Sequence, residues 1–346
     1  MSCRLIPEWH PQDAILLAWP HADTDWQATL AAIQQTYVAI IKHITRFQRV
    51  VLIVPNAIIQ AEAETVLRSN SIDNAQIIYV QAPYNDTWLR DTGPISCADD
   101  LGQIALHDFR FNGWGGKFDA RLDDGLCDAL FQQSIFVPRH RHHDIFLEGG
   151  SIDADGLGTV MTTSRCLLTP TRNPAMDKQA YADYFAQHFQ NQRLLWIEHG
   201  ELQGDDTDSH IDMLARFCNP QTIAYTACHD ARDEHFESLA KLEAQLRSLR
   251  QADGQPYTLV PLEIPQAIMN TDGERLPASY ANFLIINHAV LVPVYADPMD
   301  AIACEKLAAC FPDREIIAIE ANAIIQQGGS LHCLSMQLPA GSLKLN

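Results

Sequence analysis

The stretch DPMDAIACEKLAACFPDREIIAI, residues 297–319, contains one complete helix followed by one short strand. Asp297 and Pro298 are typical of a helix start, as the N-cap and the first helical position. The spacing of apolar residues predicts that the helix continues to Cys310. The β-branched run EIIAI at 315–319 predicts the strand that follows it. This helix-then-strand unit can be sought in the rest of the chain.

The unit recurs at a period of about sixty residues. Helices are predicted at 26–47, 123–132 (the weakest), 177–189 and 234–249, and an early strand at 50–54. The recurring strands start at Gln76 (QIIYV), Ile135 (IFV), Leu194 (LLWI), Tyr257 (YTLV) and Glu315. Each is followed by one chemically useful residue, in order Asp91, Glu148, His210, Asn282 and Cys333. A solenoid would place these five side chains in a row, whereas a closed ring would bring them together on its axis. Because carboxylates, an imidazole and a thiol together make a site, the sequence favours the ring.

The composition excludes several classes of protein. The chain has 346 residues, 47% of them hydrophobic, which predicts a globular protein with a large core. Its 43 acidic and 24 basic residues give a net charge of −19, which argues against nucleic acid and favours a cationic ligand. The early apolar run from Ala14 to Trp19 is too short for a membrane span or an export signal. We therefore expect no membrane partner and a cytoplasmic location.

Nine cysteines form an odd set without CxxC spacing. They predict neither a disulfide framework nor a structural zinc site, so most should be small buried hydrophobes, and one is a candidate for a reactive thiol. The run RHRHHD at 139–144 contains three histidines without metal-ligand spacing. It predicts a solvated loop, and no metal is expected there.

The strongest candidate nucleophile is Cys333, in the segment GGSLHC. Gly328 and Gly329 allow backbone to approach a ligand closely and leave N–H groups free to bind it. A thiol placed there can be exposed and activated. The alternative is a buried cysteine on a strand at 330–338, which this stretch alone would favour.

A candidate acid–base pair is His210 and Asp212, in GDDTDSHID. On a strand, residues two apart point to the same side, so both side chains could enter one pocket. Histidine suits proton transfer near neutral pH. The HxD pattern also occurs in metal sites, but no third ligand lies at a diagnostic spacing.

Candidate binding residues lie in loops. In NDTWLRDTGP (85–94), Asp86 and Asp91 could bind a cation and Trp88 could stack on a flat one. A capped turn with a packed tryptophan is the alternative interpretation. Trp114, in NGWGG, could form a wall of the pocket, and Glu148 precedes another glycine pair. Asn282 is expected to start a strand, where it could be an ordinary edge amide.

Together these side chains fit one kind of substrate. A guanidinium is planar, cationic and rich in donors, so its site needs several carboxylates. Attack on its carbon needs a strong nucleophile, and release of ammonia needs a proton donor. Two or three carboxylates, one histidine and one cysteine meet these demands.

The motifs also resemble those of the agmatine deiminases, which group with the bacterial peptidylarginine deiminases in the guanidino-modifying superfamily. The matching stretches, in family order, are NDTWLRDTGP (85–94), FNGWGG (111–116), LEGGSID (147–153), TTSRCLLTPTRNP (162–174), SHID (209–212), ASYANF (279–284) and GGSLHCLSMQLP (328–339), with WPHADTDW (19–26) as a weaker match. Two departures are GGSLHC in place of the usual GGGNIHC, and Ser209 in place of a glycine. The recognition of agmatine's far amine rests on residues that cannot be matched.

The resemblance implies a single catalytic domain over residues 1–346, an α/β five-bladed pseudosymmetric propeller of ββαβ modules. It implies that Cys333 attacks the guanidine carbon to form a thiouronium adduct. His210 would protonate the departing ammonia and activate water, while Asp91 and Asp212 pair with the guanidine nitrogens. Glu148 would hold His210 or the substrate, and Trp88 and Asn282 would shape the pocket.

The resemblance implies no metal and no organic cofactor. The oligomeric state, including a homo-oligomer such as a dimer, is left open. The alternatives are deimination of free or peptidyl arginine, amidino transfer to an amine, amide hydrolysis of the papain type, and non-catalytic binding of polyamines or guanidines. The papain-type reaction would leave the carboxylates without a use.

Overall fold

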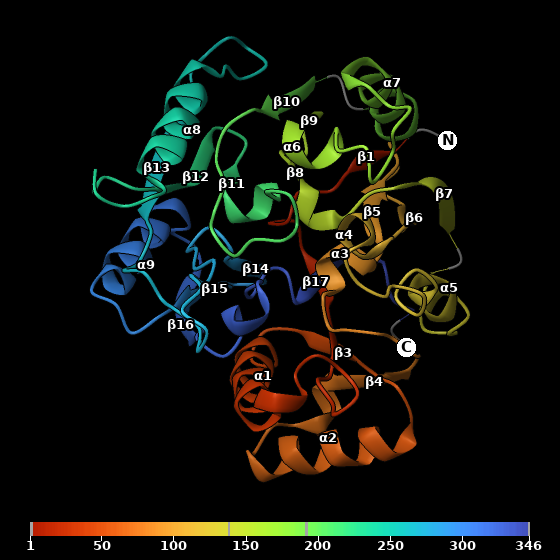
Figure 1. The fold of residues 1–346 in the computed structure, drawn as a ribbon. Helices are drawn as coiled ribbons and strands as arrows, with labels where there is room; N and C mark the ends of the chain where they lie inside the picture. Colours follow the sequence, from red (N-terminus) through yellow and green to blue (C-terminus); the bar gives the residue numbers. More distant parts are fainter. Residues whose placement is uncertain (1–2, 138, 191–192, 345–346) are drawn as a thin grey trace.

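A computed structural model describes residues 3–137, 139–190 and 193–344, and in this part of the chain the strands form five separate sheets (Figure 1). The first sheet has the strand order β1 (Arg4–Leu5), β5 (Ile95–Ala98), β6 (Ile104–Arg110), β7 (His140–Phe146). The second and third are β10 (Arg193–Ile197), β9 (Thr159–Thr163), β8 (Ile152–Ala154), and β11 (Ala215–Asn219), β12 (Thr222–Ala227), β13 (Thr258–Glu263). The fourth and fifth are β14 (Leu284–Ile286), β15 (Ala289–Val294), β16 (Glu315–Glu320), and β17 (Ser335–Pro339), β2 (Gln12–Ala18), β3 (Arg49–Val54), β4 (Ile77–Gln81).

The helices lie between the strands along the chain. The longer ones are α1 (Leu30–Ile44), α2 (Ala57–Ser69), α7 (Lys178–Phe189), α8 (Phe236–Ser248) and α9 (Met299–Cys310). The shorter ones are α3 (Leu89–Thr92), α4 (Gly113–Gly116), α5 (Leu126–Phe131) and α6 (Ser164–Leu167). In Figure 1 the longer helices lie at the periphery of the molecule, whereas the short helices α3 and α4 lie near its centre. The described residues also contain five single turns of 3-10 helix: η1 (Gln27–Thr29), η2 (Asn74–Gln76), η3 (Gly149–Ser151), η4 (Ile211–Met213) and η5 (Ile325–Gln327).

The same order of elements repeats in each sheet: two antiparallel strands, a helix, and a third strand parallel to the second. It is formed by β5, β6, α5, β7, then by β8, β9, α7, β10 and by β11, β12, α8, β13. The fourth copy is β14, β15, α9, β16. The repeat seen in the sequence therefore corresponds to real structural units.

The fifth sheet contains both ends of the chain. β17 pairs antiparallel with β2, with Ser335 opposite Leu17, and β2 pairs parallel with β3. The segment before β2 consequently lies next to the segment before β17, which contains Cys333. Side chains near the N-terminus can thus contact the segment that contains Cys333.

Two sequence predictions about residues 135–144 are wrong. The predicted strand at Ile135–Val137 is absent, and the strand of this unit, β7, begins at His140. The run is apolar because Phe136 is buried, where it forms an isolated bridge with Leu343. The predicted solvated loop at 139–144 is mostly the strand β7. Its His143 is not solvated but buried, and it stacks on Phe109 with ring centroids 4.4 Å apart.

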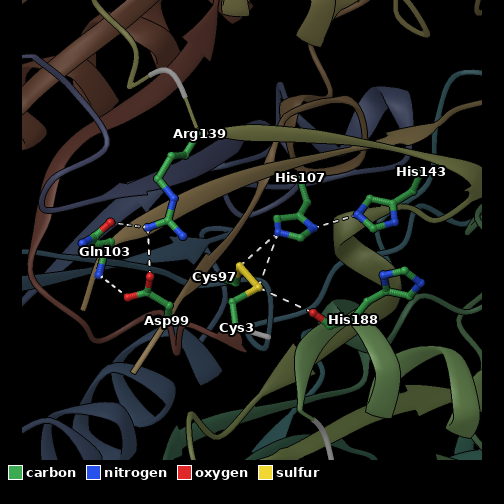
Figure 2. Close-up of a disulfide and its surroundings, with 8 residues drawn as sticks. All are labelled: Cys3, Cys97, Asp99, Gln103, His107, Arg139, His143 and His188. Carbon is green, nitrogen blue, oxygen red and sulfur yellow. Dashed lines mark hydrogen bonds and ion pairs between the residues drawn. A yellow bond between two sulfur atoms is a disulfide. The ribbon is translucent and has the colours of Figure 1, made fainter. Parts of the chain in front are cut away.

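The prediction that the cysteines form no disulfide is also wrong, because Cys3 and Cys97 are bonded (Figure 2). They are 94 residues apart, and pairing of Leu5 with Cys97 between β1 and β5 brings them together. Spacing along the chain cannot reveal such a pair. The other seven cysteines are free, and five of them are buried, as the sequence predicts for most of the set.

Three histidines, His107, His143 and His188, lie near this disulfide (Figure 2). His107 Nε2 lies 3.0 Å from Cys97 Sγ, and His107 Nδ1 lies 2.7 Å from His143 Nε2 (Figure 2). Burial is the main reason why the pKa of His107 falls to about 3 and that of His143 to about 4. Both rings are therefore neutral at physiological pH.

Among the described residues, no helix combines the length and the apolar character needed to cross a membrane.

Candidate active site

A pocket of about 430 Å³ collects six of the ten residues predicted for the site. They are Asp86, Trp88, Asp91, Trp114, Gly329 and Cys333. The other four, Glu148, His210, Asp212 and Asn282, are buried. Further acidic residues line the same pocket: Asp23, Asp25, Asp119, Asp123, Asp206 and Glu274. A space of this size and charge suits a small cation.

Asp91 belongs to the short helix α3, in a segment that the sequence predicted as a loop. Its Oδ1 accepts a hydrogen bond from the Gly150 N–H at 2.9 Å, and its Oδ2 accepts one from Trp114 Nε1 at 2.9 Å. Burial raises the pKa of Asp91 to about 6, with Asp212 and Glu148 acting in the same direction. The carboxylate is thus fixed by two neutral donors, and the nearby His210 ring lowers its pKa without outweighing burial.

His210 directly precedes the 3-10 turn η4, so the predicted strand for His210 and Asp212 is wrong. The turn nevertheless places both side chains in the site. His210 Nδ1 lies 3.6 Å from Asp91 Oδ1, and Nε2 lies 3.9 Å from Glu148 Oε2. Burial lowers the pKa of His210, but Asp91, Cys166 and Glu148 outweigh it and hold this pKa well above its usual range. The ring is therefore a cation that can donate a proton.

Three of these side chains meet at Gly150, which sequence reasoning did not single out. A Cβ atom there would lie 2.6 Å from His210 Nδ1, 2.8 Å from Asp91 Oδ1 and 3.1 Å from Asp212 Oδ2. The absence of a side chain at Gly150 is what permits this convergence. The glycine pair in LEGGS was the available signal.

Cys333 lies just before β17, not on a strand, and its side chain reaches the pocket. The amide Nδ2 of Asn282 donates to Cys333 Sγ at 3.1 Å, and the thiol donates to Asp212 Oδ2 at 3.4 Å. Asn282 lies two residues before its strand, β14. Burial, followed by Asp212 and Asp91, holds the pKa of Cys333 well above its usual range. Without a bound cation the thiol is protonated.

Glu148 is held by Arg172, another residue that sequence reasoning missed. Arg172 Nε donates to both Glu148 oxygens, at 2.8 and 2.9 Å, and both side chains are buried. Burial raises the pKa of Glu148, but His210 and Arg172 outweigh it, so this pKa is lowered. Glu148 is therefore an anion beside His210. Arg172 lies within the quoted stretch TTSRCLLTPTRNP, which was the available signal.

The outer part of the pocket is built around Trp88. Its Nε1 donates to Asp86 Oδ2 at 3.1 Å, and a Cβ atom on Gly329 would lie only 2.3 Å from the indole ring. Gly329 thus lets the backbone lie flat against Trp88. Burial raises the pKa of Asp86 to about 7, and burial does the same to the neighbouring Asp123. Asp123, another missed residue, accepts the backbone N–H of Asn85 at 2.7 Å.

Among the described residues, three groups of side chains have ligand atoms close enough to hold a metal ion. They are Cys3 with Cys97 and His107, Glu148 with Cys166 and His210, and Asp108 with Asp128 and His142. The first has its sulfurs in a disulfide, and Arg172 occupies both oxygens of Glu148 in the second. The absence of a metal stays a prediction.

Comparison with known proteins gives consistent matches. The family model described as Porphyromonas-type peptidyl-arginine deiminase matches residues 4–339. An agmatine deiminase of Stutzerimonas stutzeri (strain A1501) is 31% identical and aligns over 96% of this chain and 94% of its own. The solved structure of a cysteine-to-serine variant of C. jejuni agmatine deiminase, with substrate bound, is 36% identical, has a TM-score of 0.89, and covers 97% of this chain and 96% of that chain.

A solved structure from Porphyromonas gingivalis, provisionally named an arginine deiminase, is 40% identical with a TM-score of 0.92 and covers 99% of this chain and 100% of that chain. The folds of these relatives match the mixed α/β arrangement of sheets and helices described above. The family match extends over nearly the whole chain and includes every stretch that contributes to the pocket. The chain belongs to the Porphyromonas-type peptidyl-arginine deiminase family.

Proposed function

We propose that this protein is an agmatine deiminase, a hydrolase that converts the guanidine of agmatine to a urea and releases ammonia. The product would be N-carbamoylputrescine. The observation that supports this most directly is the convergence of Cys333, His210, Asp91 and Asp212 around one acidic pocket. The agmatine deiminases of S. stutzeri and C. jejuni, which align over most of this chain, support the same substrate.

In the proposed reaction the guanidinium nitrogens donate to Asp91 and Asp212. The bound cation offsets the two carboxylates that raise the pKa of Cys333, so the thiol releases its proton to solvent as substrate binds. The thiolate then attacks the guanidine carbon and forms a tetrahedral adduct. His210 gives its proton to the departing nitrogen, which leaves as ammonia, and a thiouronium bound to Cys333 remains.

The second half of the reaction restores the enzyme. Neutral His210 takes a proton from water, whose oxygen attacks the thiouronium carbon. The C–S bond then breaks with its pair of electrons on the Cys333 sulfur. The hydroxyl proton of the adduct passes to that sulfur, which restores the thiol as the neutral urea product leaves. Glu148, fixed by Arg172, stabilises the imidazolium whenever it carries the proton.

We also infer that the five sheets are the blades of a five-bladed pseudosymmetric α/β propeller of ββαβ modules, forming one catalytic domain over residues 1–346. The pairing of β17 with β2 supports this, because it joins the last module to the first. A cytoplasmic location stays a prediction. The Cys3–Cys97 disulfide argues against it, since disulfides persist mainly in oxidising compartments.

A second candidate is deimination of free or peptidyl arginine. The family description and the Porphyromonas gingivalis relative favour it. Against it, the α-carboxylate of free or C-terminal arginine would have to enter a pocket lined by many acids and, among the basic side chains, by Arg275. The acidic lining favours agmatine, which carries a cation at both ends.

The test is to incubate the purified protein separately with agmatine, arginine and an arginine peptide, and to measure ammonia. We expect release from agmatine without any acceptor amine, which also excludes amidino transfer. Preferential release from either arginine substrate would instead favour the second candidate. The Cys333→Ser variant should retain agmatine binding and lose nearly all turnover, by a factor of about 10⁴ or more. Normal turnover in that variant would refute the nucleophile assignment.

A further inference from the structure

A buried chain of hydrogen bonds connects the N-terminal segment to the nucleophile. His332 is the residue before Cys333, and its side chain is fully buried. His332 Nδ1 lies 2.7 Å from Asp212 Oδ2, and Nε2 lies 2.6 Å from Glu8 Oε1. Asp212 Oδ2 in turn accepts the Cys333 thiol at 3.4 Å. Glu8 and His332 are not part of the reaction proposed above.

Glu8 is fixed firmly from several sides. Arg90 Nη1 lies 3.2 Å from Glu8 Oε1, and Arg216 Nη2 and Gln337 Nε2 both donate to Oε2, the latter at 2.9 Å. Burial raises the pKa of Glu8, but Arg216, His332 and Arg90 outweigh it and hold this pKa well below its usual range. Glu8 is therefore an anion whose position is set by three different elements of the fold.

The position of His332 between two carboxylates has a consequence for its protons. A neutral imidazole has one N–H and can donate to only one of the two carboxylates. Burial raises the pKa of Asp212, but His332 outweighs it, so Asp212 is ionised like Glu8. Both short contacts are then hydrogen bonds only if both ring nitrogens bear hydrogen. Burial, Arg216 and Arg90 outweigh the two carboxylates and hold the pKa of His332 below its usual range, so the second ring proton is bound only at a pH below that range.

The two oxygens of Asp212 differ in their surroundings. Oδ2 is bonded to His332, whereas Oδ1 is buried and has no hydrogen-bond partner. A buried carboxylate oxygen without a donor is costly unless a ligand supplies one. A substrate N–H would satisfy Oδ1 only if the carboxylate kept its present rotation. The bond from His332 to Oδ2 is what fixes that rotation.

We propose that His332 and Glu8 are positioning residues for the deiminase reaction. Glu8 orients the His332 ring, and His332 holds Asp212 so that its free oxygen faces the guanidinium. The same bond withdraws charge from the Asp212 oxygen that lies beside the Cys333 sulfur. This inference rests on the proposed function, and it adds two residues that act through Asp212 without contacting the substrate.

The first test compares two substitutions that each retain one half of the imidazole. In His332→Asn the side-chain amide can replace Nδ1 and still donate to Asp212. In His332→Gln the amide extends toward Glu8 and leaves Asp212 without its donor. With agmatine we expect kcat to fall about 100-fold in His332→Gln and by less than about tenfold in His332→Asn. Equal kcat values in the two variants would overturn the proposal.

A loss of folded protein must be separated from a loss of positioning. The kcat values are therefore expressed per folded molecule, with the folded fraction measured by circular dichroism at the assay temperature, and thermal midpoints are recorded for each variant. A residue with a merely structural role would lower the midpoint and the folded fraction, and leave kcat per folded molecule unchanged. That outcome would also overturn the proposal.

A double-substitution cycle tests whether Glu8 acts through His332. Glu8→Gln alone should lower kcat about tenfold. In the His332→Asn background, where the contact with Glu8 is already lost, it should change kcat by less than about twofold. Equal effects in both backgrounds would show that Glu8 acts independently. Glu305→Gln, an exposed glutamate on α9, is the matched control and should resemble wild type.

Failure of this inference can be distinguished from failure of the proposed function. If wild type releases ammonia from agmatine while the two His332 variants behave alike, only the positioning roles are wrong. If wild type releases none, the proposed function is wrong. The alkylation rate of Cys333 still tests the network in that case, and it should be slower in His332→Gln than in His332→Asn. Equal alkylation rates would overturn the positioning roles as well.

Discussion

Gly150 lies where the side chains of His210, Asp91 and Asp212 converge. A methyl group there would lie within 2.6 Å of His210 Nδ1 and 2.8 Å of Asp91 Oδ1, so one of the two side chains must move. We expect Gly150→Ala to lower kcat/KM about 100-fold or more, since a displacement near 1 Å can have that effect. Steady-state kinetics with agmatine measure it.

The control is Gly125→Ala. A Cβ atom there would have its nearest neighbour, the Leu122 carbonyl oxygen, at 3.7 Å, and its backbone has a negative φ. Activity should remain at the wild-type level. If Gly150→Ala were equally active, the crowding of Asp91, His210 and Asp212 would not exist in solution.

Asp86 and Asp123 give the pocket a pH dependence near neutrality. Burial raises the pKa of each carboxyl to about 7, so both are largely neutral at pH 6 and ionised at pH 8. A cation should therefore bind more tightly as pH rises through 7, by roughly tenfold. Calorimetric titration of the inactive Cys333→Ser variant with agmatine measures binding without turnover.

The Asp86→Asn substitution, introduced into the same Cys333→Ser background, separates this effect from other titrations. It removes one of the two ionisations, so the gain in affinity between pH 6 and pH 8 should shrink. An unchanged pH profile would place Asp86 outside the binding site.

At the scale of elements, local patterns identify helices and strands but not sharp reversals. The predicted helix at 26–47 corresponds to α1, Leu30–Ile44, which a single turn of 3-10 helix precedes. It was predictable because its apolar residues form one buried face. The segment containing Asp91 and the one containing His210 were predicted as a loop and a strand, but both form single helical turns. Such turns are stabilised by hydrogen bonds from other parts of the chain, such as that from the Arg90 N–H to the Cys333 carbonyl and that from the Thr226 hydroxyl to the Met213 carbonyl. A sequence window does not contain those partners.

The site was more predictable than the elements that hold it. Cys333, Asp91 and Asp212 could be found because thiols and carboxylates beside turn residues indicate chemistry. Glu8 could not, because a buried ion pair across the fold has no local pattern, and Arg172 was indicated only by the family motif that contains it. Their partners, such as Arg216 for Glu8 and Glu148 for Arg172, are far away along the chain. The Cys3–Cys97 pair was missed for the same reason.

The Cys3–Cys97 disulfide should stabilise the fold substantially. β1 contributes only two paired residues, so the covalent bond is the main link between the N-terminal segment and β5. Closing a loop of 94 residues removes chain entropy from the unfolded state, and the loss of the bond should cost about 2–5 kcal/mol. Urea unfolding of oxidised wild type and of Cys97→Ser measures the difference.

Cys304→Ser, at a free and partly exposed cysteine, is the matched control and should leave the midpoint near that of wild type. The same comparison under a reducing agent should lower only the wild-type midpoint, to that of Cys97→Ser. Equal stability of oxidised wild type and Cys97→Ser would mean that the bond does not form or does not constrain the chain.

At the scale of the whole molecule, two features affect the substrate: the sheet that joins the two ends of the chain, and the negative charge of the surface. The sheet containing both β2 and β17 fixes the segment before Cys333, and the acids of the pocket belong to several other units of the repeat. The chain as a whole has a net charge of −19. An approaching dication therefore encounters an attractive field well before it meets any single carboxylate.

Salt should weaken this long-range attraction and leave the chemistry unchanged. The Debye length falls from about 10 Å at 0.1 M to about 3 Å at 1 M ionic strength, so distant acids cease to act on agmatine. We expect kcat/KM to fall roughly tenfold between low and high sodium chloride, with kcat almost constant. Steady-state kinetics over that range measure both constants. The buried pairs around Cys333 are poorly screened, so a fall in kcat would mean that salt reaches the reacting groups. A constant KM would mean that the negative surface has no part in capturing the substrate.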